Sequence, residues 1–206
     1  MHRENETVRI ESFSDGVFAI AITLLVIEIK VPGHEQVDKV GLWCALINLW
    51  PSYLAFITSF ATILVIWIQH HWIFVLVTRY DHALFYLNGL LLLFVTFIPF
   101  PTALLAEYLP YSEARVAANI YTGMFLAISL SFDLLWRHVS KCLLRKDAIQ
   151  QKKEDAIQIT RHYRFAPLLY LGAFGMSFVS EPLSIAICLV LAFLYALRGW
   201  PFRLPI

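Results

Sequence analysis

The chain has 206 residues, of which 59% are hydrophobic and 15% are charged, and its mean hydropathy is +0.67. A soluble domain needs more charge to cover its surface, so this composition excludes an ordinary soluble protein and predicts an all-α integral membrane protein in a lipid bilayer. The net charge of +1 gives no reason to expect a nucleic-acid partner, and the three scattered cysteines indicate neither a disulfide framework nor a metal site.

The first helix is predicted over residues 14–31. Ser14 or Asp15 is a suitable N-cap, because a side-chain oxygen there accepts a free backbone N–H of the first turn, and Pro32 ends the helix. Its apolar run, 16–29, is about half to two-thirds of the length that a bilayer-spanning helix needs. We therefore expect the helix to lie inside a bundle, shielded by longer helices. A cleaved signal peptide is the alternative, but the small-residue triplet lies inside the apolar run rather than after it.

The large apolar side chains of this helix share one face. At about 100° per residue, Phe13, Leu24 and Ile27 fall within about 40° of Ile20, whereas Asp15 points the opposite way. A stripe of this kind most often packs in a protein core. The pattern alone therefore leaves the role of the stripe open.

Five further helices are expected, which makes six transmembrane helices in a single unit. They cover residues 42–70, 84–105, 115–137, 163–180 and 182–198. Pro99 and Pro101 are expected to loosen or end the third helix. The last two helices are short for full spans, so a re-entrant hairpin is the alternative.

Basic residues are distributed unevenly between the predicted loops. With the amino terminus inside, only Lys30, Lys39 and Arg115 lie in outer loops, and the other 13 of the 16 Lys and Arg residues lie in inner segments. The positive-inside rule therefore predicts that both termini and the charged linker 138–162 are cytoplasmic.

Several polar and aromatic motifs follow one another in the first half of the chain. Arg-x-x-x-Phe-Ser-Asp runs from Arg9 to Asp15 and leads into the apolar stripe, and the pair His70-His71 ends the next span. The other pieces are Trp67, Phe74, Arg79-Tyr80-Asp81, Asn88 and Phe97-Ile98-Pro99-Phe100-Pro101-Thr102. In type and order these motifs resemble the transmembrane protein 175 family, the potassium channels of lysosomes and of prokaryotes.

The resemblance implies that the first helix lines a pore shared by a homotetramer. Hydrocarbon side chains of Ile20, Leu24 and Ile27 then form the constriction, and the Thr23 hydroxyl lies beside them. An alternative role for that hydroxyl is a hydrogen bond back to the carbonyl of Ala19. The family implies permeant K⁺ and other monovalent cations, protons among them, without a cofactor. A single copy of the six-span unit implies a prokaryotic plasma membrane.

A second group of residues lies near the inner ends of the first two helices. Its members are Arg9, Phe13, Ser14, Asp15, His70 and His71. Charged groups at membrane depth must pair, and Arg9 and Asp15 do not share a helix face, so we expect their partners on other helices. A static structural network is favoured over a histidine pH switch, and adjacent histidines without a further ligand motif argue against zinc.

The resemblance therefore implies a potassium-selective cation leak channel. A secondary ion or solute transporter is the alternative, for which polar residues at the midplane and broken helices are the expected signs. Only Asn88, Asn119 and the Pro99/Pro101 region fit that description. An enzyme is not expected, because no nucleophile–base pair or metal motif gathers at one membrane face.

Overall fold

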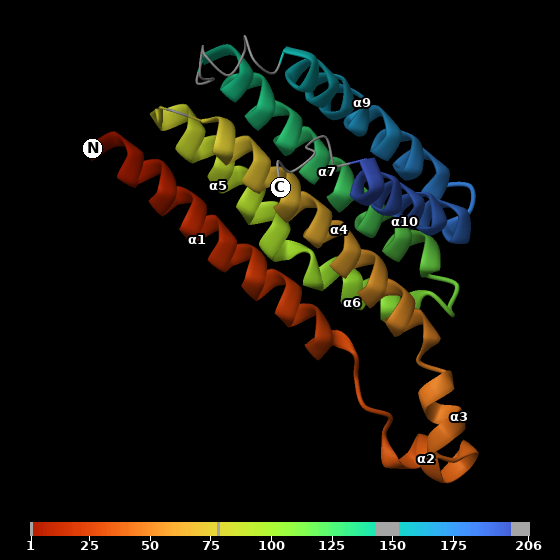
Figure 1. Cartoon of the computed structure of the whole chain (residues 1–206). Helices are drawn as coiled ribbons and strands as arrows, with labels where there is room; N and C mark the ends of the chain where they lie inside the picture. Colours follow the sequence, from red (N-terminus) through yellow and green to blue (C-terminus); the bar gives the residue numbers. More distant parts are fainter. Residues whose placement is uncertain (1, 78, 143–152, 199–206) are drawn as a thin grey trace.

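The structure is a computed structural model that describes residues 2–77, 79–142 and 153–198, in which the regular elements are helices (Figure 1). The long helices are α1 (His2–Leu24), α4 (Trp50–Leu76), α5 (His82–Phe97), α6 (Pro99–Tyr108), α7 (Ala114–Cys142), α9 (Lys153–Ser177) and α10 (Glu181–Arg198). The short ones are the 3₁₀ helix η1 (Leu25–Glu28), α2 (His34–Val40) and α3 (Leu42–Ile47). Residues 143–152 of the predicted linker lie outside the described residues.

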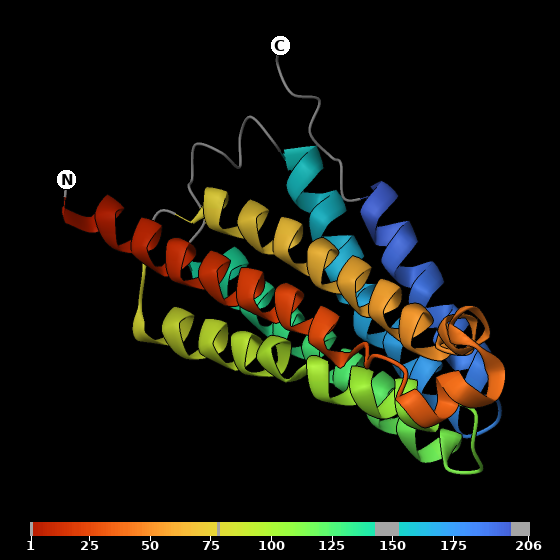
Figure 2. The same cartoon turned by 90° about the horizontal axis from the view of Figure 1, so that it is seen from below.

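The long helices form one antiparallel bundle in which α7 is central. It packs against α5, α6, α9 and α10, and its side chains Tyr121, Phe125, Leu135 and Trp136 are buried. At one edge α1 packs against α4 and α5, and at the opposite edge α9 packs against α10 (Figures 1 and 2). The core is therefore built mainly by helices other than the first.

The expectation that the first helix is shielded inside the bundle is wrong for a single chain. Only 28% of the first candidate span is buried, against 44% of each of the next two and 56% of the fourth. Any further shielding must come from outside this chain.

The boundaries of the first helix also differ from the prediction. The helix begins at His2, and Ser14 is an interior residue whose hydroxyl donates to the Ile10 carbonyl at 2.8 Å. The N-cap prediction failed because this hydroxyl bonds backward along an existing helix rather than forward into a new one. At the other end, regular helix stops at Glu28, before Pro32 is reached.

Prolines divide the third predicted span as expected, so that residues 84–105 become α5 and α6. Because Pro99 has no N–H, the Val95 carbonyl instead accepts from the Ile98 N–H at 3.2 Å, and the chain bends there. The second span is also longer than predicted: α4 has Pro51 in its first turn and continues to Leu76. The fourth likewise extends from Ala114 to Cys142.

Within the residues that the structure describes, four helical segments are long and apolar enough to cross a bilayer. They are Thr7–Glu28, Leu42–Leu76, His82–Tyr108 and Ala114–Cys142. The last two predicted spans correspond to the shorter apolar helices Phe165–Ser177 and Glu181–Ala196. The structure therefore describes an all-helical, multi-pass membrane bundle.

Beyond one end of this bundle, α2 and α3 project as a small helical hairpin (Figure 1). They pack against each other, and α2 has no buried residue. Gly41 joins them with a φ of 79°, a left-handed conformation that glycine adopts without steric cost.

The contact between α7 and α9 depends on a glycine, which leads to a test of the packing. A Cβ at Gly123 would lie 3.3 Å from Cε2 of Phe174. Gly123→Val should therefore destabilise the purified protein by about 1–3 kcal/mol through overpacking, measured as a lower melting temperature in detergent. The control is Gly172→Val, where no atom lies within 4 Å of the new Cβ. Equal melting temperatures for the two variants would contradict the close contact between α7 and α9 at Gly123.

Candidate functional site

The predicted stripe of the first helix is an exposed face of the single chain. The exposed fractions are 67% for Phe13, 59% for Ile20, 41% for Leu24 and 70% for Ile27. Four large hydrocarbon side chains along one helix face thus have little cover from the rest of the subunit. Such a face suits contact with lipid, with further copies of the chain, or with the wall of a pore.

The buried face of the same helix carries small and large residues that pack against the bundle. Phe18, Ala21 and Leu25 are at most 1% exposed, and Ile22 is half-buried. The helix is therefore fixed in rotation, with the stripe turned away from α4 and α5.

The transition from α1 to η1 changes the alignment of the stripe. In a 3₁₀ helix residues three apart eclipse, whereas in an α-helix they are about 60° out of line. Ile27 lies in η1, which follows directly after Leu24. The 3₁₀ segment therefore brings Ile27 closer to register with Leu24 than a continuous α-helix would.

The Thr23 hydroxyl is bonded back to its own helix. Its Oγ1 lies 3.0 Å from the Ala19 carbonyl and 2.9 Å from the Ile20 carbonyl, and the side chain is exposed. The single hydroxyl proton is used by these carbonyls, while the oxygen lone pairs remain free to accept. The backbone hydrogen bond and a contact with a passing cation are thus compatible.

A buried chain of hydrogen bonds joins three helices on the side of α1 that faces the bundle. His70 Nε2 on α4 lies 2.8 Å from Asn88 Oδ1 on α5, and Asn88 Nδ2 donates to Ser14 Oγ on α1 at 2.9 Å. The single proton of Ser14 goes to the Ile10 carbonyl, so Ser14 must accept from Asn88. The Asn88 oxygen then faces His70, and His70 must carry its proton on Nε2.

The other ring nitrogen of His70 has no hydrogen-bond partner among the described residues. The ring is fully buried, with centroids 4.4 Å from Phe74 and 5.2 Å from Phe18. A second proton on Nδ1 would therefore enter an apolar enclosure without an acceptor, which is costly. This geometry favours a static role for His70 over a pH switch.

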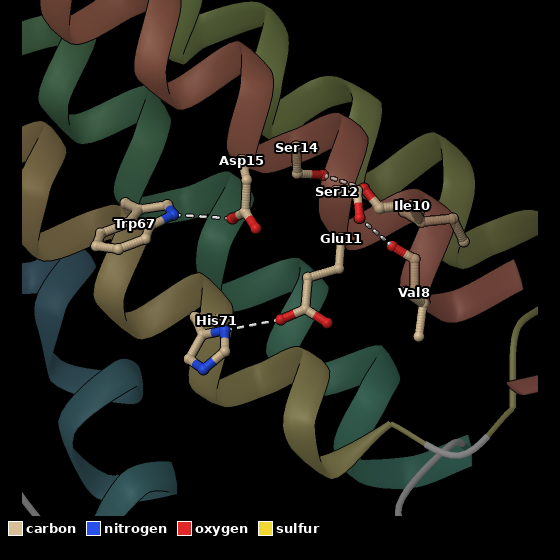
Figure 3. A network of polar contacts seen from close by, with 8 residues as sticks. All are labelled: Val8, Ile10, Glu11, Ser12, Ser14, Asp15, Trp67 and His71. Carbon is tan, nitrogen blue, oxygen red and sulfur yellow. Dashed lines mark hydrogen bonds and ion pairs between the residues drawn. The ribbon is translucent and has the colours of Figure 1, made fainter. Parts of the chain in front are cut away.

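Two further contacts join α1 to α4 on the side turned away from α5 (Figure 3). Trp67 Nε1 donates to Asp15 Oδ1 at 2.8 Å, and His71 Nδ1 lies 2.7 Å from Glu11 Oε1. Asp15 thus has a partner on another helix, but that partner is an indole rather than Arg9 or a histidine. His71 and Glu11 are both partly exposed.

Arg9 does not join this network within the described part of the chain. It is exposed and, with Phe13, lines a groove between α1 and α5. Asn88 and Gly89 lie on the other wall. A cation beside an open groove has room for a partner from outside the subunit.

Sequence reasoning identified four of the residues that form contacts here, but not the links between them. Asn88 and Trp67 were named only as pieces of the resemblance, and Glu11 was not singled out. A lone amide in an apolar run does signal a buried partner, and Trp67 and His71 are four residues apart and so share a face. Among the described residues no group of three or more His, Cys, Asp or Glu side chains is arranged to hold a metal ion.

Comparison with known proteins gives matches to one family of channels. The family described as "Endosomal/lysosomal potassium channel TMEM175" matches residues 9–99. A potassium channel of Chamaesiphon minutus is 60% identical over 199 residues, covering 95% of this chain and 96% of that protein. A potassium channel of Streptomyces collinus is 43% identical over 201 residues, covering 96% and 95%.

A solved structure has the same fold. The crystal structure of a lysosomal potassium-selective channel TMEM175 homolog from Chamaesiphon minutus matches with a TM-score of 0.86 at 60% identity. The match covers 95% of this chain and 99% of that one. The likeness therefore extends well beyond the motif-bearing first half.

The hydrogen-bond chain through Asn88 can be tested by removing its central amide. Asn88→Leu leaves the His70 N–H without an acceptor and Ser14 without a donor, and should destabilise the protein by about 1–3 kcal/mol. Denaturation in detergent measures this loss. Thr96→Val on the same helix is the control, because that exposed hydroxyl bonds only to the Leu93 carbonyl. If both variants unfold like the wild type, the chain of bonds is not structural.

Proposed function

The chain belongs to the TMEM175 family, and on this basis we propose that it is a potassium-selective cation leak channel in which α1 from four copies surrounds one pore. The relatives that match nearly its full length are named potassium channels, which argues against both the transporter alternative and an enzyme. The observation that carries the proposal is the exposed hydrocarbon face on the least buried span.

One copy cannot enclose an axial pore with a single helix, so the proposal requires oligomerisation. A ring of four places Ile20, Leu24 and Ile27 around the axis as the constriction, with Thr23 on the shoulder. From Ile20 to Ile27 the constriction extends about 12 Å, at 1.5 Å per residue in α1 and 2.0 Å in the 3₁₀ segment.

A hydrocarbon constriction can favour potassium through hydration. Branched apolar side chains offer an ion no oxygen, so passage depends on how much hydration water the ion sheds. Sodium holds its water more tightly than potassium and is therefore hindered more. The same constriction can close by losing its water, since hydrophobic pores gate by dewetting.

The two flanks of α1 carry opposite charges, which supports a closed ring. Arg9 lies on the α5 side, beside the groove, while Glu11 and Asp15 lie on the α4 side. In a cyclic assembly each copy offers one flank to one neighbour and the other flank to the next. Arg9 of one copy then meets the acidic flank of the adjacent copy.

The proposal includes six spans with both termini cytoplasmic, in the plasma membrane of a prokaryote. The directions of α1, α4, α5, α7, α9 and α10 alternate, and α6 continues in the direction of α5 (Figure 1). Lys30, Lys39 and Arg115 lie at the end that carries α2 and α3, which becomes the outer end by the positive-inside rule. The helices α9 and α10 complete the six.

The direct test is a recording from the purified protein in planar bilayers with potassium on one side and sodium on the other. A reversal potential displaced toward the potassium equilibrium value is expected. A bilayer without current, or a current with no preference between the two ions, would overturn the proposal.

The number of subunits can be determined from the mass of the assembly. Native mass spectrometry or light scattering in detergent should give four times the 23.7 kDa of one chain. Chemical cross-linking in membranes should stop at the same species. A stable monomer would exclude the shared pore while leaving the membrane fold intact.

The pore face is tested by two substitutions on one helix. Ile20→Asn places an amide on the exposed stripe, where it faces water in an assembled pore, so the protein should fold and assemble. The polar group should lower the dewetting barrier, giving larger currents and a potassium/sodium permeability ratio closer to one. Recordings from proteoliposomes measure both quantities.

Ile22→Asn is the matched control, because Ile22 is half-buried against the core. There the amide lacks partners and should destabilise the protein by about 1–3 kcal/mol. Equal damage from both substitutions, with no change in current, would count against the stripe as the pore wall.

A further inference from the structure

The segment that follows η1 holds two opposite charges close together, Glu28 at the end of η1 and Lys30 just after it. Lys30 Nζ lies 3.0 Å from Glu107 Oε2 at the end of α6. We propose that Glu107 is a positioning residue that holds Lys30 away from the outer mouth of the channel, leaving Glu28 to attract permeant cations. This inference rests on the proposed function and adds to it a cation-attracting entrance of defined residues.

The direction of the ion pair follows from the packing of η1. Leu25 is fully buried while Ile27 is 70% exposed, and the helices against which η1 packs are α4 and α6. Glu107 belongs to α6, one of the helices against which η1 packs, although its side chain is 55% exposed. The Lys30 ammonium is therefore drawn toward the bundle and away from the side on which Ile27 is exposed.

Lys30 stays positively charged, so its position affects the electrostatic potential around neighbouring groups such as Glu28. The hydrogen bond from Lys30 to Glu107, followed by the charge of that carboxylate, raises the pKa of Lys30, and Glu28 raises it further. Glu28 is thus near enough for the Lys30 charge to act on it. Without Glu107, the nearest carboxylate available to Lys30 on its own segment is Glu28.

The same arrangement recurs across this end of the bundle. Its three basic side chains all have an acidic partner: Lys30 with Glu107, Lys39 with Glu35, and Arg115 with Glu181. The remaining acidic side chains, Glu28, Asp38 and Glu113, form no ion pair in the described part of the chain. Each copy therefore presents six acidic against three basic side chains at this end.

Glu28 differs from the other two unpaired acids in its position. It directly follows Ile27, the last residue of the stripe, whereas Asp38 lies on the projecting α2 and Glu113 in the loop before α7. Four copies of Glu28 around the axis form an anionic ring, and such rings raise the local concentration of cations at a pore entrance.

The test is single-channel potassium conductance at low and high salt. At about 10 mM salt the Debye length is about 30 Å, so charges at the mouth act strongly, and at about 1 M it is about 3 Å. Glu28→Gln should lower the conductance about twofold or more in low salt and leave it near the wild-type value in high salt.

Glu107→Gln should have a similar effect, because the released Lys30 turns toward Glu28. Lys30→Gln alone should change the conductance little, since its charge is already held away. The double variant Lys30→Gln/Glu107→Gln should return to the wild-type conductance. A simple sum of charges predicts instead that the two single variants have equal and opposite effects.

The pair Arg115–Glu181 supplies the control. It lies on α7 and α10, away from the edge formed by α1, with Arg115 Nε 3.1 Å from Glu181 Oε1. Glu181→Gln also releases a cation at the same end but should leave the conductance unchanged. Size-exclusion profiles of all variants should match, because every changed side chain is at least partly exposed.

The outcomes distinguish failure of the Glu107 positioning role or of the Glu28 ring from failure of the proposed potassium channel. Equal and opposite effects of Lys30→Gln and Glu107→Gln, or an effect of Glu181→Gln as large as that of Glu107→Gln, would overturn the positioning role. Conductance unaffected by Glu28→Gln in low salt would overturn the entrance ring while leaving the potassium channel intact. Absence of any wild-type potassium current would overturn both.

Discussion

The rotation of α1 about its own axis depends on one chain of hydrogen bonds, from His70 through Asn88 to Ser14. Buried polar groups in a membrane bundle must find partners within the protein, since lipid offers none. Because the three residues come from α4, α5 and α1, satisfying them fixes these helices against one another. A turn of α1 that moved Ser14 away would leave the Asn88 side-chain N–H without its acceptor. The hydrocarbon stripe therefore faces outward as a consequence of polar bonds on the other side of the helix.

The two faces of α1 differ in what they contact. The bonded face ties the helix to its own subunit, through Ser14, Phe18 and Leu25. The side chains of the exposed face make few contacts within the subunit, so they can pack only against molecules outside it. Substitutions on the exposed face should therefore disturb the fold of the single chain little, because this face contributes little to its packing.

Much of the architecture could be predicted from local patterns, and what could not depends on contacts distant in sequence. Apolar length and proline positions indicated four helical segments long enough to span a bilayer and the break at Pro99. A 100° periodicity placed Ile20 and Ile27 on one face, and both are exposed in the structure. The start of α1 was missed because Ser14 resembles an N-cap locally, and only the helix preceding it shows that it is interior. The indole partner of Asp15 lies 52 residues away, so no spacing rule could have identified it.

The short apolar run of the first helix has a physical explanation in this structure. The candidate span is Thr7–Glu28, whose 22 residues are as long as a bilayer requires, but its first half carries Glu11, Ser14 and Asp15. Each of these side chains is bonded to another helix or to the backbone. Along the polar first half of the span, contacts with protein therefore take the place of contacts with lipid. Only the apolar second half can lie against lipid hydrocarbon. A helix of this composition is stable only where other helices surround it on nearly every side. Since this chain covers only one side of α1, the remaining cover must come from outside the chain, and the proposed ring of four copies would supply it.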